Sequence, residues 1–161
     1  MPILHIQYNA FLANPQGQQV AIDPRVVLQQ RGPVIQVTIS LAQASAQTLL
    51  QGGKTAPAPV SGLALIDTGA SDTCIDNAAA QTMGLPVIDV VTITSATHVN
   101  EPCNVYPISI EVAGVPIVIE APRVLGANLA AQGLLLLIGR NVLQSCNFIY
   151  NGVAGTITLS A

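Results

Sequence analysis

The stretch Leu63-Ala64-Leu65-Ile66-Asp67-Thr68-Gly69-Ala70-Ser71 places an acidic residue directly after a short apolar run. The run Leu63 to Ile66 predicts a buried strand, and an ionised carboxylate left alone at its end would be unfavourable to bury. Gly69 lets the chain turn sharply and lets another backbone approach closely. Thr68 and Ser71 bring hydroxyl groups close to Asp67. A carboxylate among small hydrogen-bonding residues at a strand end suits acid–base chemistry on water.

The tripeptide Asp67-Thr68-Gly69 also has a simpler interpretation. Asp and Gly are common in turns, and the aspartate could do no more than bind its own backbone. Three residues alone therefore do not identify a catalytic site, and the rest of the sequence has to decide.

Leu65-Ile66-Asp67-Thr68-Gly69-Ala70-Ser71 resembles the active-site signature of the retropepsin-like aspartic peptidases, the group that contains retroviral proteases and their cellular and bacterial relatives. That family has a second signature near the C-terminus, in which two apolar residues and a glycine are usually followed by Arg and a short helix. Leu137-Ile138-Gly139-Arg140-Asn141-Val142-Leu143 resembles it and lies about seventy residues after Asp67. Together the two motifs are more specific than either alone. The resemblance covers roughly Gly32 to the C-terminus.

The resemblance implies a role for each residue of the first motif. Asp67 matches the catalytic aspartate. Thr68 matches the residue whose hydroxyl locks two active-site loops together across a dimer axis. Gly69 matches the glycine that lines the substrate cleft, and Ala70 and Ser71 complete the active-site loop.

The second motif, Leu137 to Arg140, matches the segment that packs behind the active-site loop in the family. Many retroviral relatives have an acid two positions after the motif glycine, and that acid pairs with the arginine. Here that position is Ser71, and the acid is its neighbour Asp72. We therefore expect an ion pair between Asp72 and Arg140. The alternative is a surface arginine with little effect on stability.

The resemblance also implies a β-hairpin flap between the motifs, at about Thr92 to Val105, that closes over substrate. Its tip and substrate contacts would come from Ser95-Ala96-Thr97-His98-Val99-Asn100, before Glu101-Pro102. This stretch has no glycine, whereas retroviral flap tips are Gly-rich. His98 could touch substrate from the tip, although a solvated loop histidine is the simpler interpretation.

The number of acidic motifs bears on how many chains form a site. Asp-Thr-Gly occurs once and Asp-Ser-Gly does not occur, whereas pepsin-like enzymes carry two such motifs on a chain about twice as long. The chemistry needs two carboxylates that share a proton, because like charges at close range cannot both ionise. Two chains related by a two-fold axis can supply Asp67 twice. The sequence therefore predicts half of a two-fold symmetric active site per chain, and hence a homodimer.

The composition of the chain is consistent with an apolar surface that a partner covers. The 161 residues point to one domain, and 50% are apolar while only 8% are charged. Such a low charged fraction suggests that a partner covers apolar surface, although a monomer with a Thr-, Gln- and Ser-rich surface would also account for it.

Several other function classes have little support in the sequence. The net charge is −3 with five Lys or Arg, so nucleic-acid binding lacks a basic surface. The longest apolar run, Leu134 to Ile138, is too short to cross a membrane, and the first residues lack the features of a secretory signal. Cys74, Cys103 and Cys146 have neither metal spacing nor an even count, and small buried side chains are the simplest interpretation. We expect a cytoplasmic protein without metal or organic cofactor.

β-Branched residues between turn signals predict an all-β fold, namely a closed barrel with one or two short helices. Val34 to Leu41 alternates with one apolar face, as a half-buried strand does. Ala113-Gly114 is the expected turn of a hairpin. The other expected strands are Leu63 to Ile66, Val90 to Thr94, Val105 to Val112, Val115 to Glu120, Leu134 to Ile138, Asn147 to Tyr150 and Thr156 to Leu159.

Two segments outside these strands are expected to be helical. Asp76 can cap a helix over Asn77 to Met83, with Gly84 at its C-terminal end. Arg140 to Ser145 is the second. Ala42 to Pro59, rich in Ala, Gln, Gly and Pro, is the most linker-like stretch of the chain.

Residues 1–32 have no counterpart in the resemblance and form an N-terminal extension, followed by a retropepsin-like aspartic peptidase domain over 33–161. Ile3 to Tyr8 and Arg25 to Gln30 could be strands. The extension could add strands, extend the dimer interface, or mimic a self-processed leader that occupies the cleft.

The favoured function is an aspartic endopeptidase in which water is activated between the two Asp67 carboxylates of a homodimer. Its substrate would be an extended peptide with apolar side chains at the scissile bond, cleaved best under acidic to mildly acidic conditions. The alternative is a retropepsin-like dimerisation or peptide-binding module with weak or no proteolysis. A monomer with an incomplete site is a third interpretation.

Overall fold

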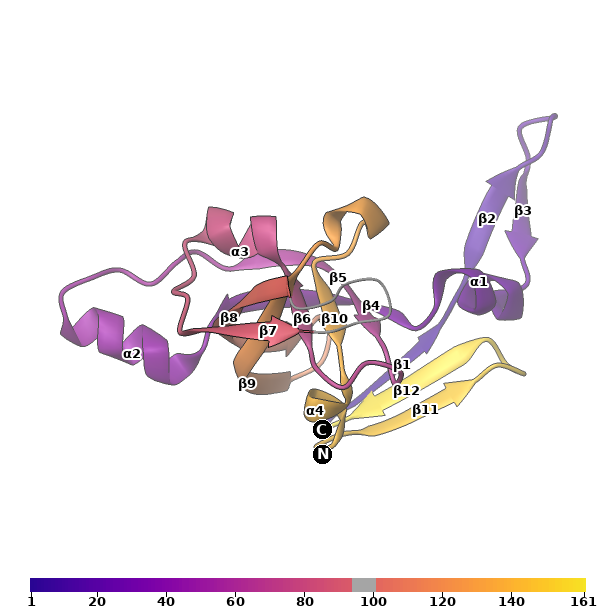
Figure 1. Ribbon diagram of the computed structural model, residues 1–161. Helices are drawn as coiled ribbons and strands as arrows, with labels where there is room; N and C mark the ends of the chain where they lie inside the picture. Colours follow the sequence, from indigo (N-terminus) through magenta and orange to yellow (C-terminus); the bar gives the residue numbers. More distant parts are fainter. Residues whose placement is uncertain (94–100) are drawn as a thin grey trace.

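A closed six-stranded barrel forms the body of the molecule (Figure 1). The structure is a computed structural model that describes residues 1–93 and 101–161. The strands follow one another in the order β4-β5-β10-β6-β9-β8, and pairing between β8 and β4 closes the ring. The predicted all-β barrel is therefore confirmed. The barrel strands are β4 (Val34–Leu41), β5 (Val60–Ile66), β6 (Cys74–Asp76), β8 (Glu101–Val112), β9 (Ile117–Ala127) and β10 (Leu136–Ile138).

Strand β4 shows why the barrel closes. Its alternating apolar residues Ile35, Val37, Ile39 and Leu41 are all buried, as their period of two predicts. Its residues 34–39 pair with β5, and its residues 37–41 also pair with β8 on the other side. Both edges of the strand are thus occupied, which removes an exposed sheet edge.

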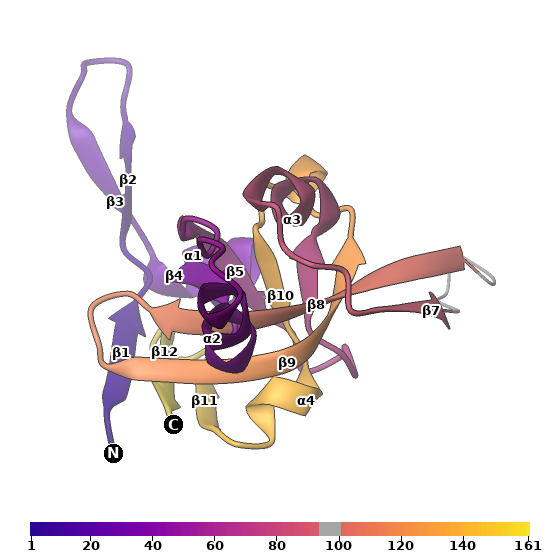
Figure 2. The ribbon, with the colours of Figure 1, turned by 90° about the vertical axis from the view of Figure 1, so that its left-hand side faces the viewer.

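The β8–β9 hairpin turns at the predicted Ala113-Gly114, where Gly114 has a φ of +82°. Strand β8 begins earlier than expected, and its first residues pair with β7 (Asp89–Ile93). Strand β7 and the start of β8 extend beyond the barrel (Figure 2). The predicted flap-tip residues 95–100 lie outside the described residues.

A second sheet combines the two ends of the chain, in the order β1-β12-β11. It consists of β1 (Ile3–Gln7), β12 (Thr156–Ser160) and β11 (Asn147–Asn151). Leu4, Ile157 and Leu159 from this sheet join the same apolar core as the barrel residues. A separate two-stranded hairpin of β2 (Ala10–Ala13) and β3 (Gln19–Ile22) projects from the side of the barrel opposite α2 (Figure 1).

The suggestion of a strand at Arg25 to Gln30 is wrong, because these residues form helix α1 (Pro24–Arg31). The Asp23 side chain caps this helix by accepting the Arg25 N–H at 2.9 Å, and Pro24 occupies the first turn. Val27 and Leu28 are buried on one face of the helix. Asp23-Pro24 is therefore a helix-start signal that, in the sequence, resembles a turn.

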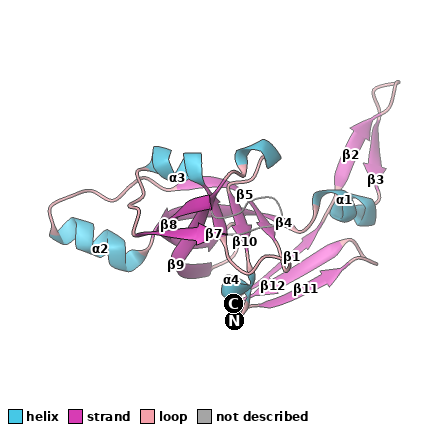
Figure 3. Cartoon of the chain, in the orientation of Figure 1, coloured by secondary structure: helices cyan, strands magenta, loops and turns pink. Residues whose placement is uncertain are grey.

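The linker-like interpretation of Ala42 to Pro59 is wrong for its first half, which forms helix α2 (Gln43–Gln51). Its Ala, Gln and Leu residues favour helix, and the Glu120 carboxylate accepts the Gln43 N–H at 3.0 Å. With α1, α2, α3 (Asn77–Met83) and α4 (Arg140–Leu143), the described residues contain four α-helices rather than one or two. A 3-10 turn, η1 (Ala130–Gln132), adds to them, and the helices lie around the barrel (Figure 3).

Asp76 caps α3 as predicted, by accepting the Ala79 N–H at 3.0 Å. It also accepts the N–H groups of Leu129 and Ala130 at 3.0 and 2.9 Å, and so joins two distant parts of the chain. Burial alone would raise the pKa of Asp76, but these amide hydrogen bonds outweigh burial and hold its pKa below the usual range. The ionised form therefore stabilises the fold.

Replacement of this carboxylate is expected to weaken the fold in a pH-dependent way. Asp76→Ala removes a cap and leaves two further N–H groups unpaired, which should lower the free energy of unfolding by about 2–3 kcal/mol at pH 7. A folded pKa below the unfolded value of about 3.9 means that this stabilisation exists above that value and disappears as the pH falls through the folded pKa. Urea unfolding at pH 7 and at pH 3 tests this, with the exposed Glu111→Ala as control. An equal loss of stability at both pH values would contradict it.

Candidate active site

Asp67 lies at the end of β5, where its backbone still follows the strand. Its N–H donates to the Ile138 carbonyl at 2.9 Å, which extends the parallel β5–β10 pairing by one residue. Burial alternates along β5, with Ala64 and Ile66 inside the barrel and Leu65 on the opposite face. The half-buried Asp67 side chain therefore lies on the same outer face as Leu65.

The Asp67 carboxylate is held through one of its oxygens. Oδ1 accepts the Gly69 N–H at 2.8 Å, and a Cβ at Gly69 would lie 3.0 Å from the same oxygen. Within residues 1–93 and 101–161, no group donates a hydrogen bond to Oδ2. The exposed Thr68 hydroxyl likewise has no hydrogen-bond partner in this part of the chain. The loop thus presents a carboxylate oxygen and a hydroxyl outward.

The structure brings the two predicted motifs together. The N–H groups of Arg140 and Asn141 donate to the carbonyls of Ala70 and Ser71, both at 3.0 Å. Leu137 pairs with Leu65 in the β10–β5 ladder. The second motif therefore lies directly against the loop that carries Asp67.

Two residues that were not predicted from the sequence connect these motifs. Thr73 is fully buried, and both its N–H and its hydroxyl donate to the Asn141 side-chain oxygen, at 2.9 and 2.8 Å. The Thr73 hydroxyl in turn accepts the Gly139 N–H at 3.0 Å. The available signal was position alone, because Thr73 lies two residues after Ser71 and Asn141 directly follows Arg140. This network fixes the loop from behind.

The predicted ion pair between Asp72 and Arg140 is wrong. The Arg140 guanidinium instead donates to the carbonyls of Thr68 and Gly69, at 2.8 and 2.9 Å, and to the Ser71 hydroxyl at 2.8 Å. The turn of the loop directs these oxygens at the guanidinium, while the Asp72 side chain is exposed and forms no ion pair with the described residues. Arg140 therefore holds the loop through hydrogen bonds to uncharged oxygens rather than through an ion pair.

Cys74 is the cysteine that follows this loop, and it is not activated. Burial, with smaller contributions from Cys103, Asp72 and Asp67, raises the pKa of Cys74 to about 11. A thiol with that pKa stays protonated near neutral pH, so it is a poor nucleophile. Among residues 1–93 and 101–161, no three His, Cys, Asp or Glu side chains gather in a way that could hold a metal, and no helix is long and apolar enough to cross a membrane.

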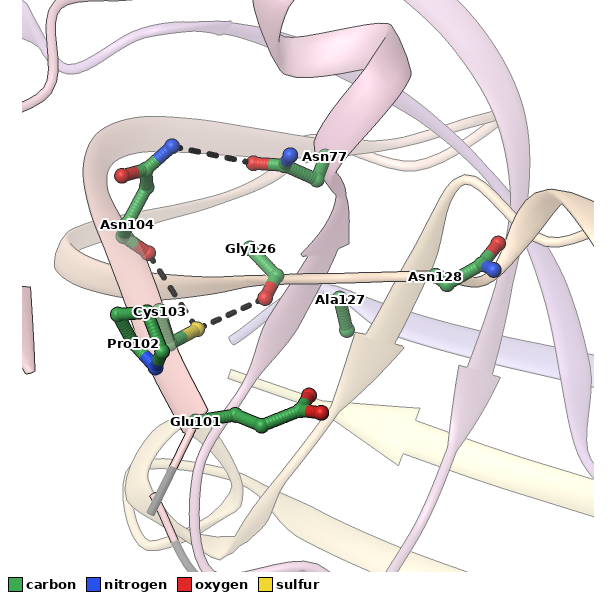
Figure 4. Close-up of a pocket in the computed structure, with 8 residues that line it drawn as sticks. All are labelled: Asn77, Glu101, Pro102, Cys103, Asn104, Gly126, Ala127 and Asn128. Atoms are coloured by element: carbon green, nitrogen blue, oxygen red, sulfur yellow. Dashed lines mark hydrogen bonds between the residues drawn. The ribbon is translucent and has the colours of Figure 1, made fainter. Parts of the chain in front are cut away.

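A pocket of about 310 Å³ lies beside the start of β8 and the end of β9 (Figure 4). The Cys103 thiol in it points at the Gly126 carbonyl, at 2.8 Å, and the side chains of Asn77 and Asn104 face each other. Glu101 is the single carboxylic acid among its described lining residues. The described lining of this pocket therefore does not bring two carboxylic acids together.

Comparison with known protein families places both motifs in one family match. A family model described as aspartyl protease matches residues 52–141, which include both motifs. A retropepsin-like aspartic protease from Rickettsia conorii is structurally similar, with 16% identity and a TM-score of 0.43, over 98% of this chain and 90% of that one. A protease–reverse transcriptase of prototype foamy virus has 16% identity and a TM-score of 0.40 over 68% of this chain.

This chain spans only 11% of the length of the foamy virus protein. No curated protein sequence matches it. The family model nevertheless covers more than half of the 161 residues, including the single Asp-Thr-Gly and the glycine motif packed against it. The chain therefore belongs to the aspartyl protease family, and it carries the acidic motif once.

Proposed function

We propose that the protein is an aspartic endopeptidase that works as a homodimer, with one Asp67 from each chain. The observation that carries this proposal is the Asp67 carboxylate itself. It lies on a loop fastened by Arg140 and the second motif, and its Oδ2 receives no hydrogen bond from the described chain. One such acid per chain is half of what the reaction needs.

In the proposed mechanism, one Asp67 of the dimer is ionised and the other carries a proton. The ionised carboxylate takes a proton from water, and the water oxygen attacks the peptide carbonyl while the protonated partner donates to the carbonyl oxygen. No bond forms between enzyme and substrate. The hydrogen bonds behind the loop support this chemistry because they keep the carboxylate in a fixed position.

The dimer would be formed around the two loops. The exposed Thr68 hydroxyl, without a partner in the described part of the chain, is available to bond the partner's loop. The antiparallel β7–β8 strands would carry the flap over an extended peptide, and we propose that residues 95–100 contact that peptide. All three cysteines are free thiols, which favours a reducing compartment such as the cytoplasm.

Activity that depends on dimer formation is the expected result. A library of extended peptides should be cleaved at mildly acidic pH, and cleavage per mole of protein should rise with protein concentration as the dimer fraction does. Analytical ultracentrifugation over the same concentrations measures that fraction. A pepstatin-type inhibitor, which mimics the tetrahedral intermediate, should block cleavage.

Two outcomes would count against the proposal. Cleavage by a species with monomer mass would refute the two-chain site. A stable dimer that binds peptides without cutting them would instead indicate a binding module.

A further inference from the structure

A pocket of about 620 Å³ lies on the outer face of β5, where Leu63 and Leu65 line it. Leu65, which lines the pocket, is on the same face of the strand as Asp67 and two residues before it. Residues two apart on a strand are separated by about 7 Å. A peptide placed over Asp67 therefore has this pocket within reach of a side chain near the scissile bond.

Residues before the barrel build one wall of the pocket. Tyr8 and the last residues of α1, Gln30 and Arg31, line it together with Leu65. The Tyr8 hydroxyl donates to the Val34 carbonyl at 2.9 Å, and burial, with a smaller effect of Tyr150, raises the pKa of Tyr8 to about 12. The hydroxyl therefore stays a donor at all ordinary pH values, and the wall is fixed to β4.

Gly32 allows helix α1 to end against this strand. Its φ is +72°, and a Cβ there would lie 2.9 Å from Cδ1 of Leu65. Any other residue would be strained in this backbone conformation, and its Cβ would also displace the Leu65 methyl group. The close approach holds Arg31, the preceding residue, at the edge of the pocket.

Arg31 is the single charged residue among the described residues that line the pocket. Its exposed guanidinium forms no ion pair or hydrogen bond within residues 1–93 and 101–161. The adjoining surface is apolar and comes from Val34, Leu65 and Leu134. A methylene stem that ends in a carboxylate matches this combination, because an arginine fork binds carboxylates in a bidentate manner.

We propose that this pocket is a specificity subsite for an acidic substrate side chain, with Arg31 as the residue that selects it. The stem of a substrate glutamate lies on Val34, Leu65 and Leu134, and its carboxylate meets Arg31 and Gln30. The inference rests on the proposed peptidase function for the identity of the ligand. It gives part of residues 1–32 a role in substrate choice.

The test uses matched peptides that differ only in Glu, Gln or Lys at one position near the cleavage site. Wild-type protein should prefer Glu over Gln by about fivefold in kcat/KM, the upper range for a solvent-exposed ion pair. Arg31→Gln should abolish this preference, with the larger loss of kcat/KM on the Glu peptide, and Arg31→Glu should favour the Lys peptide. Lys54→Gln removes the same charge away from the pocket and is the matched control.

Binding of the same peptides to the Asp67→Asn variant, followed by fluorescence anisotropy, separates this inference from the proposed function. If the wild-type protein cleaves none of these peptides, the peptidase proposal fails, while a Glu preference in binding that depends on Arg31 still supports the subsite. Equal binding of the Glu and Gln peptides would overturn the subsite. So would dissociation of the dimer by Arg31→Gln in sedimentation, because Arg31 would then pair with the partner subunit.

Discussion

The Asp67→Asn variant is expected to fold normally and to lose peptide hydrolysis by about a thousandfold or more. Asparagine has nearly the same shape, and its side-chain oxygen can still accept the Gly69 N–H that Oδ1 accepts at 2.8 Å. An amide, however, neither takes a proton from water nor shares one with a second acid. Peptide cleavage, measured next to circular dichroism of the same sample, tests both halves of the expectation.

The neighbouring Asp72→Asn variant is the matched control for Asp67→Asn. The Asp72 carboxylate lies on the same loop, is exposed and forms no ion pair with described residues. The Asp72→Asn variant should therefore keep most of the activity. Cleavage by Asp67→Asn at the wild-type rate would refute a role for this acid in catalysis.

Dimers that mix wild-type and Asp67→Asn chains test whether each active site needs an Asp67 from both chains. When wild-type and Asp67→Asn chains are mixed in equal amounts and exchange freely, about one quarter of the dimers contain two intact acids. Activity per total protein should then fall to about a quarter of the wild-type value, whereas chains that act independently would keep about half. A result near one half would show that each chain carries a complete site.

The parts of the fold that follow from local pattern were predictable from the sequence. Strand β4 has its expected bounds because its alternating residues bury one face. Helix α3 begins and ends as expected, because Asp76 and Gly84 carry capping signals within the segment itself. In contrast, β6 has only three residues, too few to show any period. The Glu120 carboxylate that caps α2 lies 77 residues away, so no local signal showed it.

The candidate site was predictable in its position but not in its supporting contacts. The two motifs identified Asp67 and the segment behind it, and the structure places them together. The partner of Arg140 was expected from charge, yet the loop presents carbonyl oxygens to it, and backbone direction cannot be read from residue types. The pairing of Thr73 with Asn141 joins residues 68 positions apart and depends on the closed barrel.

The Gly139→Ala variant is expected to have the largest effect on stability, with a loss of about 3 kcal/mol or more in the free energy of unfolding. Gly139 has a φ of −88°, which every residue can adopt, so the glycine is needed only for space. A Cβ there would lie 2.5 Å from the carbonyl carbon and oxygen of Asp72 and 2.9 Å from the Thr73 nitrogen. These are backbone atoms, which cannot rotate away as a side chain does.

The added methyl group in Gly139→Ala should therefore push the second motif away from the loop that carries Asp67. The hydrogen bonds from Arg140 and Asn141 to that loop would break, and activity would fall together with stability. Urea unfolding at one fixed protein concentration measures the effect. Gly52→Ala is the control, because Gly52 has a φ of −81° and a Cβ there would lie an ordinary 3.4 Å from the nearest atom. The free energy of unfolding of this control should change by less than about 1 kcal/mol. Equal urea midpoints for the two variants would mean that the glycine motif does not pack against the acidic loop, and the geometry on which the proposed site depends would be lost with it.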